Sequence, residues 1–311
     1  MTIVITMVKL LLAMAIGFYL ARKDILDENT SVKISHIIIH ITSPCMILGS
    51  VSSISNGDAS AVIKLFFIGI FMYVIVYYFA GKLFTKIFRI PKDMTGTYIS
   101  MIWFSNTAFM GYPVSQAFLG ESSIFYNMIF NMSWNIIMYS IGLNLYRQDA
   151  AVSTGGSAKR KIEYKKFINA GTIASVIALI IFFTGVSLPD GFYDCVSFIG
   201  DVTPALSMIV IGGSLASISF KDLVSEKAIW CMLPFRLALM PAITYLCLRL
   251  IIDDPLIIAA CTISIGMPVG ATVAMASAPY PKQHKAAAAG VALSTLFSMI
   301  TIPILGILLG V

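Results

Sequence analysis

Two Gly-X-Pro motifs inside long apolar stretches are the features of this sequence best suited to binding a solute. They are Gly111-Tyr112-Pro113 and Gly266-Met267-Pro268. Proline lacks a backbone N–H and clashes with the preceding helical turn, and glycine loosens that turn further. In lipid an unsatisfied backbone group is costly, so a break is tolerated only inside protein or beside a wet cavity. We therefore expect each motif to interrupt a membrane helix beside a polar cavity.

The two interruptions predict an anion-binding site. Each would start a new half-helix, at Pro113 and at Pro268, whose amino end exposes N–H groups and a partial charge of about +0.5. Two such ends near the membrane centre favour a small organic anion, and the carbonyl ends of the preceding half-helices favour a cation, such as a coupling proton or Na⁺. The alternative is that Gly and Pro only permit a kink and close helix packing.

Polar side chains accumulate around the two motifs. An asparagine stripe, Asn127, Asn131 and Asn135, recurs every four residues and so lies on one helix face, which in a membrane must meet protein or water. The alternative is that these amides join neighbouring helices. The candidate substrate-binding residues are Asn106, Thr107, Gly111, Tyr112, Pro113, Gln116, Asn131, Asn135, Gly266, Met267, Pro268 and Thr272.

Four ionisable residues inside apolar stretches are candidates for ion coupling or charge relay, because charges at membrane depth are costly. They are Lys9, His40, Asp201 and Arg236. Asp201 could carry a coupling proton or pair with Lys9 or Arg236, and Arg236 could hold a substrate carboxylate bidentately. The alternatives are a structural salt bridge for Asp201 and Arg236, and a side chain reaching the membrane surface for Lys9.

Composition and hydropathy place these residues in an all-α membrane protein. Of 311 residues, 58% are hydrophobic and only 12% charged, about half the charge of a typical soluble domain. A helix needs about 20 apolar residues to cross a bilayer. Ten stretches qualify as transmembrane helices: 2–21, 34–54, 61–81, 95–119, 122–146, 168–188, 194–217, 228–251, 255–279 and 286–310.

The loop charges predict the orientation of these ten helices. Seventeen of the 21 Lys and Arg residues lie in the odd-numbered loops. The positive-inside rule places those loops in the cytoplasm and both termini outside. The basic residues therefore carry topology information, and we expect no nucleic-acid partner. The first stretch lacks a basic segment before it, so we expect an uncleaved span.

The long polar loop 148–167 divides the chain into two five-helix halves, 1–147 and 168–311. Because five is odd, the second half must enter the membrane inverted, an arrangement common in transporters. Residues 49–55 and 213–219 have similar sequences at equivalent places, as do the two Gly-X-Pro motifs. We therefore predict two inverted repeats, with helices 4 and 9 broken and facing each other.

Other functional classes fit less well. The five cysteines lie in or beside apolar stretches without a CxxC pair, so neither a disulfide nor a metal framework is expected. No HExxH, GxGD or suitably partnered GxS motif indicates an intramembrane enzyme. No acidic residue lies in the core of helix 4 or 9, which argues against a carboxylate-lined Na⁺ site. A secondary transporter is favoured, with a transporter-fold sensor or channel as the alternative and an enzyme as the least favoured.

The sequence resembles the auxin efflux carrier family, which includes bacterial organic-anion permeases and the plant PIN carriers. The motifs that carry the resemblance are 17–25 leading into the Pro44 stretch, 106–113, the Thr203-Pro204 stretch with 212–216, and Gly266-Met267-Pro268. The plant carriers have Asn-Pro-Asn at the crossing, where this sequence has Gly-Tyr-Pro and Gly-Met-Pro, so auxin is not the expected substrate.

The resemblance implies further properties. The fold would be similar to that of bile-acid/sodium symporters, with helices 4 and 9 crossing in a mobile transport domain. Helices 1, 2, 6 and 7 would form a scaffold that dimerises, and transport would follow an elevator mechanism. The substrate would be a malate- or malonate-like mono- or dicarboxylate, and the location a bacterial-type inner (plasma) membrane.

Overall fold

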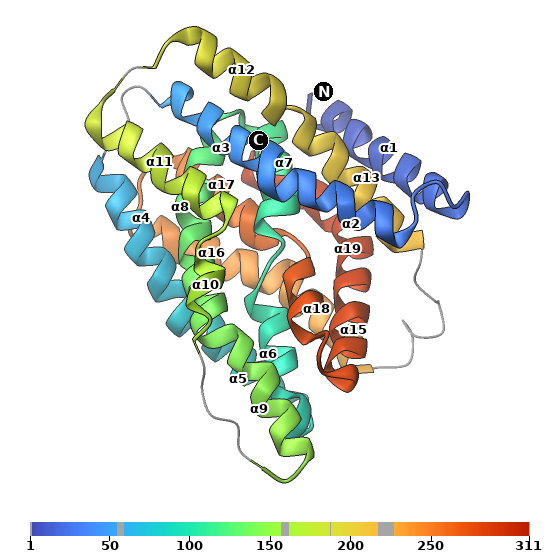
Figure 1. The fold of residues 1–311 in the computed structure, drawn as a ribbon. Helices are drawn as coiled ribbons and strands as arrows, with labels where there is room; N and C mark the ends of the chain where they lie inside the picture. The colour runs from blue at the N-terminus through green and yellow to red at the C-terminus, as the bar shows by residue number, and fades with distance from the viewer. Residues whose placement is uncertain (1, 55–58, 157–161, 187, 217–226, 311) are drawn as a thin grey trace.

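The computed structural model describes residues 2–54, 59–156, 162–186, 188–216 and 227–310, and these form a helical protein without a named strand (Figure 1). Lys159, Arg160, Lys161, Lys221 and residues 217–219 of the predicted repeat lie outside the described residues. Five continuous helical segments in the described ranges are long and apolar enough to cross a bilayer. They are Asn29–Ser53, Ala59–Ile87, Asp190–Ala216, Lys227–Arg249 and Pro281–Leu309.

The first half of the chain begins with α1, a helix without a break. Its described helices are α1 (Thr2–Arg22), α2 (Glu28–Ile37), η1 (Ile38–Thr42), α3 (Ser43–Ser50), η2 (Val51–Ser53), α4 (Ala59–Phe71), η3 (Met72–Tyr77), α5 (Tyr78–Ile87), η4 (Lys92–Met94), α6 (Thr95–Trp103), η5 (Thr107–Gly111), α7 (Tyr112–Leu119), α8 (Ser122–Ile137), η6 (Met138–Gly142) and α9 (Leu143–Ser153). Helix α9 therefore continues into the predicted linker 148–167.

In the second half of the chain, a non-helical segment separates α17 from α18. Its described helices are α10 (Tyr164–Phe167), α11 (Ala170–Thr184), α12 (Asp190–Gly200), α13 (Val202–Ala216), α15 (Lys227–Pro234), η7 (Phe235–Leu239), α16 (Met240–Arg249), α17 (Pro255–Gly266), α18 (Ala271–Ser277) and α19 (Pro281–Leu309). The number of membrane crossings and the inverted relation of the halves stay predictions.

Wide π-helical turns let several prolines sit in continuous helices. The turns η1, η5 and η7 end two residues before Pro44, Pro113 and Pro241 respectively. A proline ring clashes with the carbonyl of the preceding turn and offers no N–H. The wider i→i+5 spacing of a π turn gives that ring room. These prolines therefore bend or widen a helix without ending it.

Helices α1 and α13 cross at very close range and lie side by side in Figure 1. A Cβ atom added to Gly17 would lie 1.9 Å from the carbonyl oxygen of Ile209, and one added to Gly212 would lie 1.9 Å from that of Met14. Only glycine permits such an approach of two backbones. The main buried core is separate from this crossing, because it joins α4–α9 with α15–α19 and includes residues of α3, η2 and α11.

Candidate functional site

Two non-helical segments meet in the middle of the fold and hold each other in place. Residues 104–106, the first break, separate α6 from η5, and residues 267–270, the second break, separate α17 from α18. Asn106 N donates to Pro268 O at 2.9 Å and Gly270 N donates to Phe104 O at 3.0 Å. Ser105 and Val269 form an antiparallel bridge between them. We call this paired region the crossover.

The first break does not lie where the proline predicted it. Gly111 and Pro113 stand in continuous helix, with Gly111 closing the turn η5 and Pro113 near the start of α7. The π turn accommodates the proline, so the half-helix begins at Thr107 and not at Pro113. The second break includes Pro268 as predicted, but its half-helix begins at Ala271.

Other backbone groups freed by the two breaks find partners in the following helical turn or on neighbouring helices. Asn106 O accepts from Met110 N and Gly111 N at 3.2 and 3.0 Å. Val269 N donates to Ser294 Oγ at 3.0 Å. Met267 O, beyond the carboxyl end of α17, accepts from the Arg236 guanidinium at 3.0 Å. Buried backbone groups need such partners, so these hydrogen bonds stabilise the non-helical backbone at the crossover.

A cavity of about 170 Å³ lies against the crossover, enough for roughly five water molecules or one small solute. Six predicted substrate-binding residues line it: Asn106, Thr107, Tyr112, Asn131, Asn135 and Thr272. The sequence analysis did not single out the other lining residues. These are Ile39, Ser43, Ile47, Ser105, Ala108, Phe109, Trp134, Tyr139, Asn169, Gly171, Gly270, Ala271 and Met275.

A hydrogen-bonded network fixes one wall of the cavity. The Thr107 hydroxyl donates to Asn131 Oδ1, and Asn131 Nδ2 donates to the Tyr112 hydroxyl at 3.0 Å. Asn135 Nδ2 donates to Asn131 O at 3.1 Å. The third member of the stripe, Asn127, is fully buried and binds Ser115 Oγ instead. Two of the three asparagines thus face the cavity, and one serves packing.

The wall of the cavity carries no charged side chain within the described residues. The amino end of the helical segment that starts at Thr107 and runs through η5 and α7 lies at the cavity, and such an end carries a partial positive charge. Amide and hydroxyl groups complete the wall, so the arrangement can bind a small polar or anionic solute.

Six predicted binding residues lie away from the cavity. Gly111 packs near Ser264, and Gly266 near Leu305. Gln116 Nε2 donates to Asp201 Oδ1 at 3.2 Å, at a separate place between α7 and the junction of α12 and α13. The remaining three, Pro113, Met267 and Pro268, are buried around the crossover.

The four ionisable candidates are not brought together. Arg236 is completely buried and binds Met267 O, and among the described residues it pairs with neither Asp201 nor another acid. Lys9, His40 and Asp201 are exposed on the protein surface. His40 Nδ1 lies 2.9 Å from His36 O in its own helix.

The residues missed by the sequence analysis show what local patterns do not reveal. Asn169 caps α11, with its Oδ1 accepting from Thr172 N at 3.0 Å, a signal that a capping pattern offers. Ser105 and Trp134 carry no motif. They line the cavity because the crossover and α8 bring them there.

Comparison with known proteins identifies the family of this arrangement. Residues 2–305 match the family described as membrane transport protein. The chain belongs to the membrane transport protein family. This match confirms the resemblance to the auxin efflux carriers. As a member of this transporter family, the chain is a multi-pass membrane protein. An uncharacterized transporter of Methanocaldococcus jannaschii is 23% identical over 310 residues, covering 95% of each chain.

Proposed function

We propose that this protein is a secondary transporter that carries a small organic anion across the membrane. The observation that carries the proposal is the crossover: two interrupted helices paired by hydrogen bonds, with a polar cavity against them. Paired helix interruptions at the middle of a membrane protein are where transporters place substrate and ion sites. The family membership supports the same conclusion.

The proposed substrate is a malate- or malonate-like carboxylate. A carboxylate matches the amino end of the helical segment that starts at Thr107, together with the amides of Asn106, Asn135 and Asn169 beside the cavity. The small free volume favours a compact acid over a large amphipathic one. A proton or Na⁺ is the proposed coupling ion, and the neutral oxygens beside the described cavity are of the kind that can ligate Na⁺.

An elevator movement is the proposed mechanism, with the crossover in the moving part. The cavity reaches Tyr139, Asn169 and Met275, which lie near the predicted cytoplasmic ends of their helices. On the predicted outer side, Gln116 contacts Asp201. This combination supports an inward-facing state, in a ten-helix inverted repeat with both termini outside. We further propose dimerisation through the scaffold formed by α1, α2–α3, α11 and α12–α13.

Uptake into proteoliposomes tests the proposal, with two asparagines of α8–α9 as a matched pair. Asn135 and Asn144 each donate an amide hydrogen bond to the carbonyl four residues earlier, and Asn144 also accepts one from Arg147 at 3.2 Å, but only Asn135 lines the cavity. We expect gradient-driven uptake of radiolabelled malonate or malate, and a loss of about tenfold in Asn135→Ala with little change in Asn144→Ala. A tenfold change corresponds to about 1.4 kcal/mol, near the value of one hydrogen bond.

Two results would contradict the proposal. One is no movement of any mono- or dicarboxylate under a proton or Na⁺ gradient. The other is a single-molecule conductance far above carrier turnover, which would make the protein a channel.

A further inference from the structure

Arg236 is a positive charge enclosed directly behind the crossover. Its side chain is 0% exposed. One guanidinium nitrogen, Nη2, donates to Met267 O in the second break at 3.0 Å. The other two, Nε and Nη1, have no hydrogen-bond partner within the described residues. Guanidinium remains protonated in proteins, so the charge itself persists there.

Within the described residues, no acid pairs with Arg236 to neutralise its charge. The ionisable groups close enough to interact with it electrostatically are two tyrosines, Tyr73 and Tyr77, and no described acid is among them. The Tyr77 hydroxyl shares a hydrogen bond with Thr244 Oγ1 at 2.8 Å. The Tyr73 hydroxyl has no hydrogen-bond partner within the described residues. An isolated buried charge is costly unless something of opposite sign compensates it.

An anion bound in the cavity could compensate the charge of Arg236. Ser105 and Gly270 line the cavity and belong to the two breaks, and Met267, which holds the guanidinium, lies three residues before Gly270. Three peptide units span at most about 11 Å. Met267, which the guanidinium contacts, and Gly270, which lines the cavity, therefore lie within about that distance of each other.

We infer that Arg236 is a positioning residue that gives the cavity its preference for negative charge. It holds the second break through Met267 O, and its uncompensated charge attracts an anion that it does not touch. The inference deepens the proposed function and rests on it. The side chains of the cavity wall are neutral, so the inference attributes the selectivity for anions to a residue outside that wall.

We take about 10 Å, the scale set by those three peptide units, as the working separation between the charge and a solute in the cavity. A unit charge about 10 Å away, in a medium of effective dielectric constant about 20, changes the binding of a singly charged ligand roughly tenfold. A doubly charged ligand feels twice the free energy, so its affinity changes roughly a hundredfold. A neutral ligand of the same shape feels almost none.

Three ligands of equal size but different charge test the inference: malonate, its half-amide malonamate, and the neutral diamide malonamide. Their affinities are measured by calorimetry on the full-length purified protein in lipid nanodiscs at neutral pH. Wild type should bind them in order of charge. Arg236→Gln keeps an amide for Met267 O and removes the charge, and should weaken malonate roughly a hundredfold, malonamate roughly tenfold and malonamide hardly at all. Arg236→Lys should give a malonate affinity between those of wild type and Arg236→Gln, because a buried ammonium loses its proton more readily than a guanidinium.

The outcomes separate the inference from the proposed function. If Arg236→Gln weakens all three ligands equally, Arg236 only supports the backbone and the inference is wrong, while anion transport stands. If both variants fail to fold, the wild-type series decides, because equal binding of malonate and malonamide overturns the inference. If wild type binds none of the carboxylates, the proposed function is wrong and the inference falls with it.

Discussion

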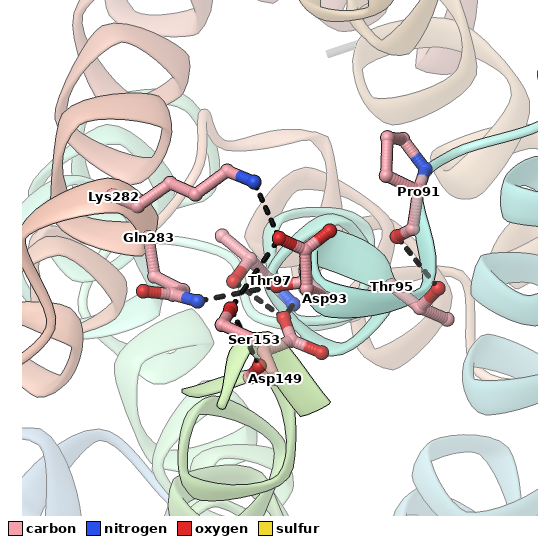
Figure 2. Close-up of polar contacts among 8 residues, drawn as sticks. All are labelled: Pro91, Asp93, Thr95, Thr97, Asp149, Ser153, Lys282 and Gln283. Carbon is pink, nitrogen blue, oxygen red and sulfur yellow. Dashed lines mark hydrogen bonds and ion pairs between the residues drawn. The ribbon is translucent and has the colours of Figure 1, made fainter. Parts of the chain in front are cut away.

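Replacing Asp149 with alanine should destabilise the amino end of α6, the helix that precedes the first break. Asp149 lies on α9 and its carboxylate binds the amino end of α6 (Figure 2). Gly96 N donates to Oδ1 at 2.8 Å, Thr97 N donates to Oδ2 at 2.7 Å, and the Thr97 hydroxyl donates to Oδ2 at 2.8 Å. The side chain is 3% exposed, so water cannot replace these contacts.

The expected loss follows from the three stranded donors. A buried donor left without a partner costs about 1–3 kcal/mol. The lower end applies here, because removing the carboxylate also removes its own desolvation cost, and three donors then give about 3 kcal/mol. At about 2 °C per kcal/mol for a chain of this size, the melting temperature should fall by roughly 6 °C.

Asp93 provides the matched control in the same cluster (Figure 2). Its carboxylate binds Lys282, whose side chain is 59% exposed, so the pair is worth at most about 1 kcal/mol. The bond from Gln283 Nε2 to Asp93 O is a backbone contact and survives the substitution. Asp93→Ala should lower the melting temperature by no more than about 2 °C.

The protein is heated in detergent, and the fraction that remains monodisperse is measured by size-exclusion chromatography. Both variants are compared with wild type at one pH and one salt concentration. If Asp149→Ala melts within 2 °C of Asp93→Ala, burial of the capping contacts does not stabilise α6, and the reasoning is wrong.

Three further predictions concern pH, helix crossing and the cavity wall. Burial raises the pKa of Asp149 above its ordinary value of 3.8, so the native state binds a proton more readily. Wild type should therefore gain stability relative to Asp149→Asn as the pH falls through that raised pKa towards 3.8, measured by parallel melting curves. Gly17→Ala should lower the melting temperature by several degrees, because its Cβ would meet Ile209 O; Gly191→Ala, with nothing within 4 Å, should not. Thr107→Val should strand Asn131 Oδ1 and weaken malonate binding about tenfold in calorimetry, and unchanged affinity would place the substrate elsewhere.

Much of the site was accessible from the sequence because its signals are periodic. Two members of the asparagine stripe, Asn131 and Asn135, line the cavity, while the third, Asn127, packs against Ser115. Pro268 marked the second break within a residue or two, since a proline there meets no compensating π turn. Family membership was also visible, in motifs spread over the whole chain.

The first break shows where local signals fail. Pro113 carries the strongest helix-breaking signal of its stretch, yet η5 absorbs it and the chain stays helical. The chain opens instead at residues 104–106, which contain neither Gly nor Pro. Hydrogen bonds to Pro268 and Gly270, distant in sequence, hold that segment extended.

The sequence by itself determined the class of protein, because hydropathy and charge decide the solvent of each stretch without reference to any partner. It also determined which stretches carry polar stripes. Only the tertiary structure decided where the first helix opens, which polar groups share the cavity, and that Arg236 stands behind the crossover and not in it. The physical reason is that a buried backbone group can give up its helical hydrogen bond only where another segment supplies a partner. The local sequence around the break does not show which distant segment supplies it.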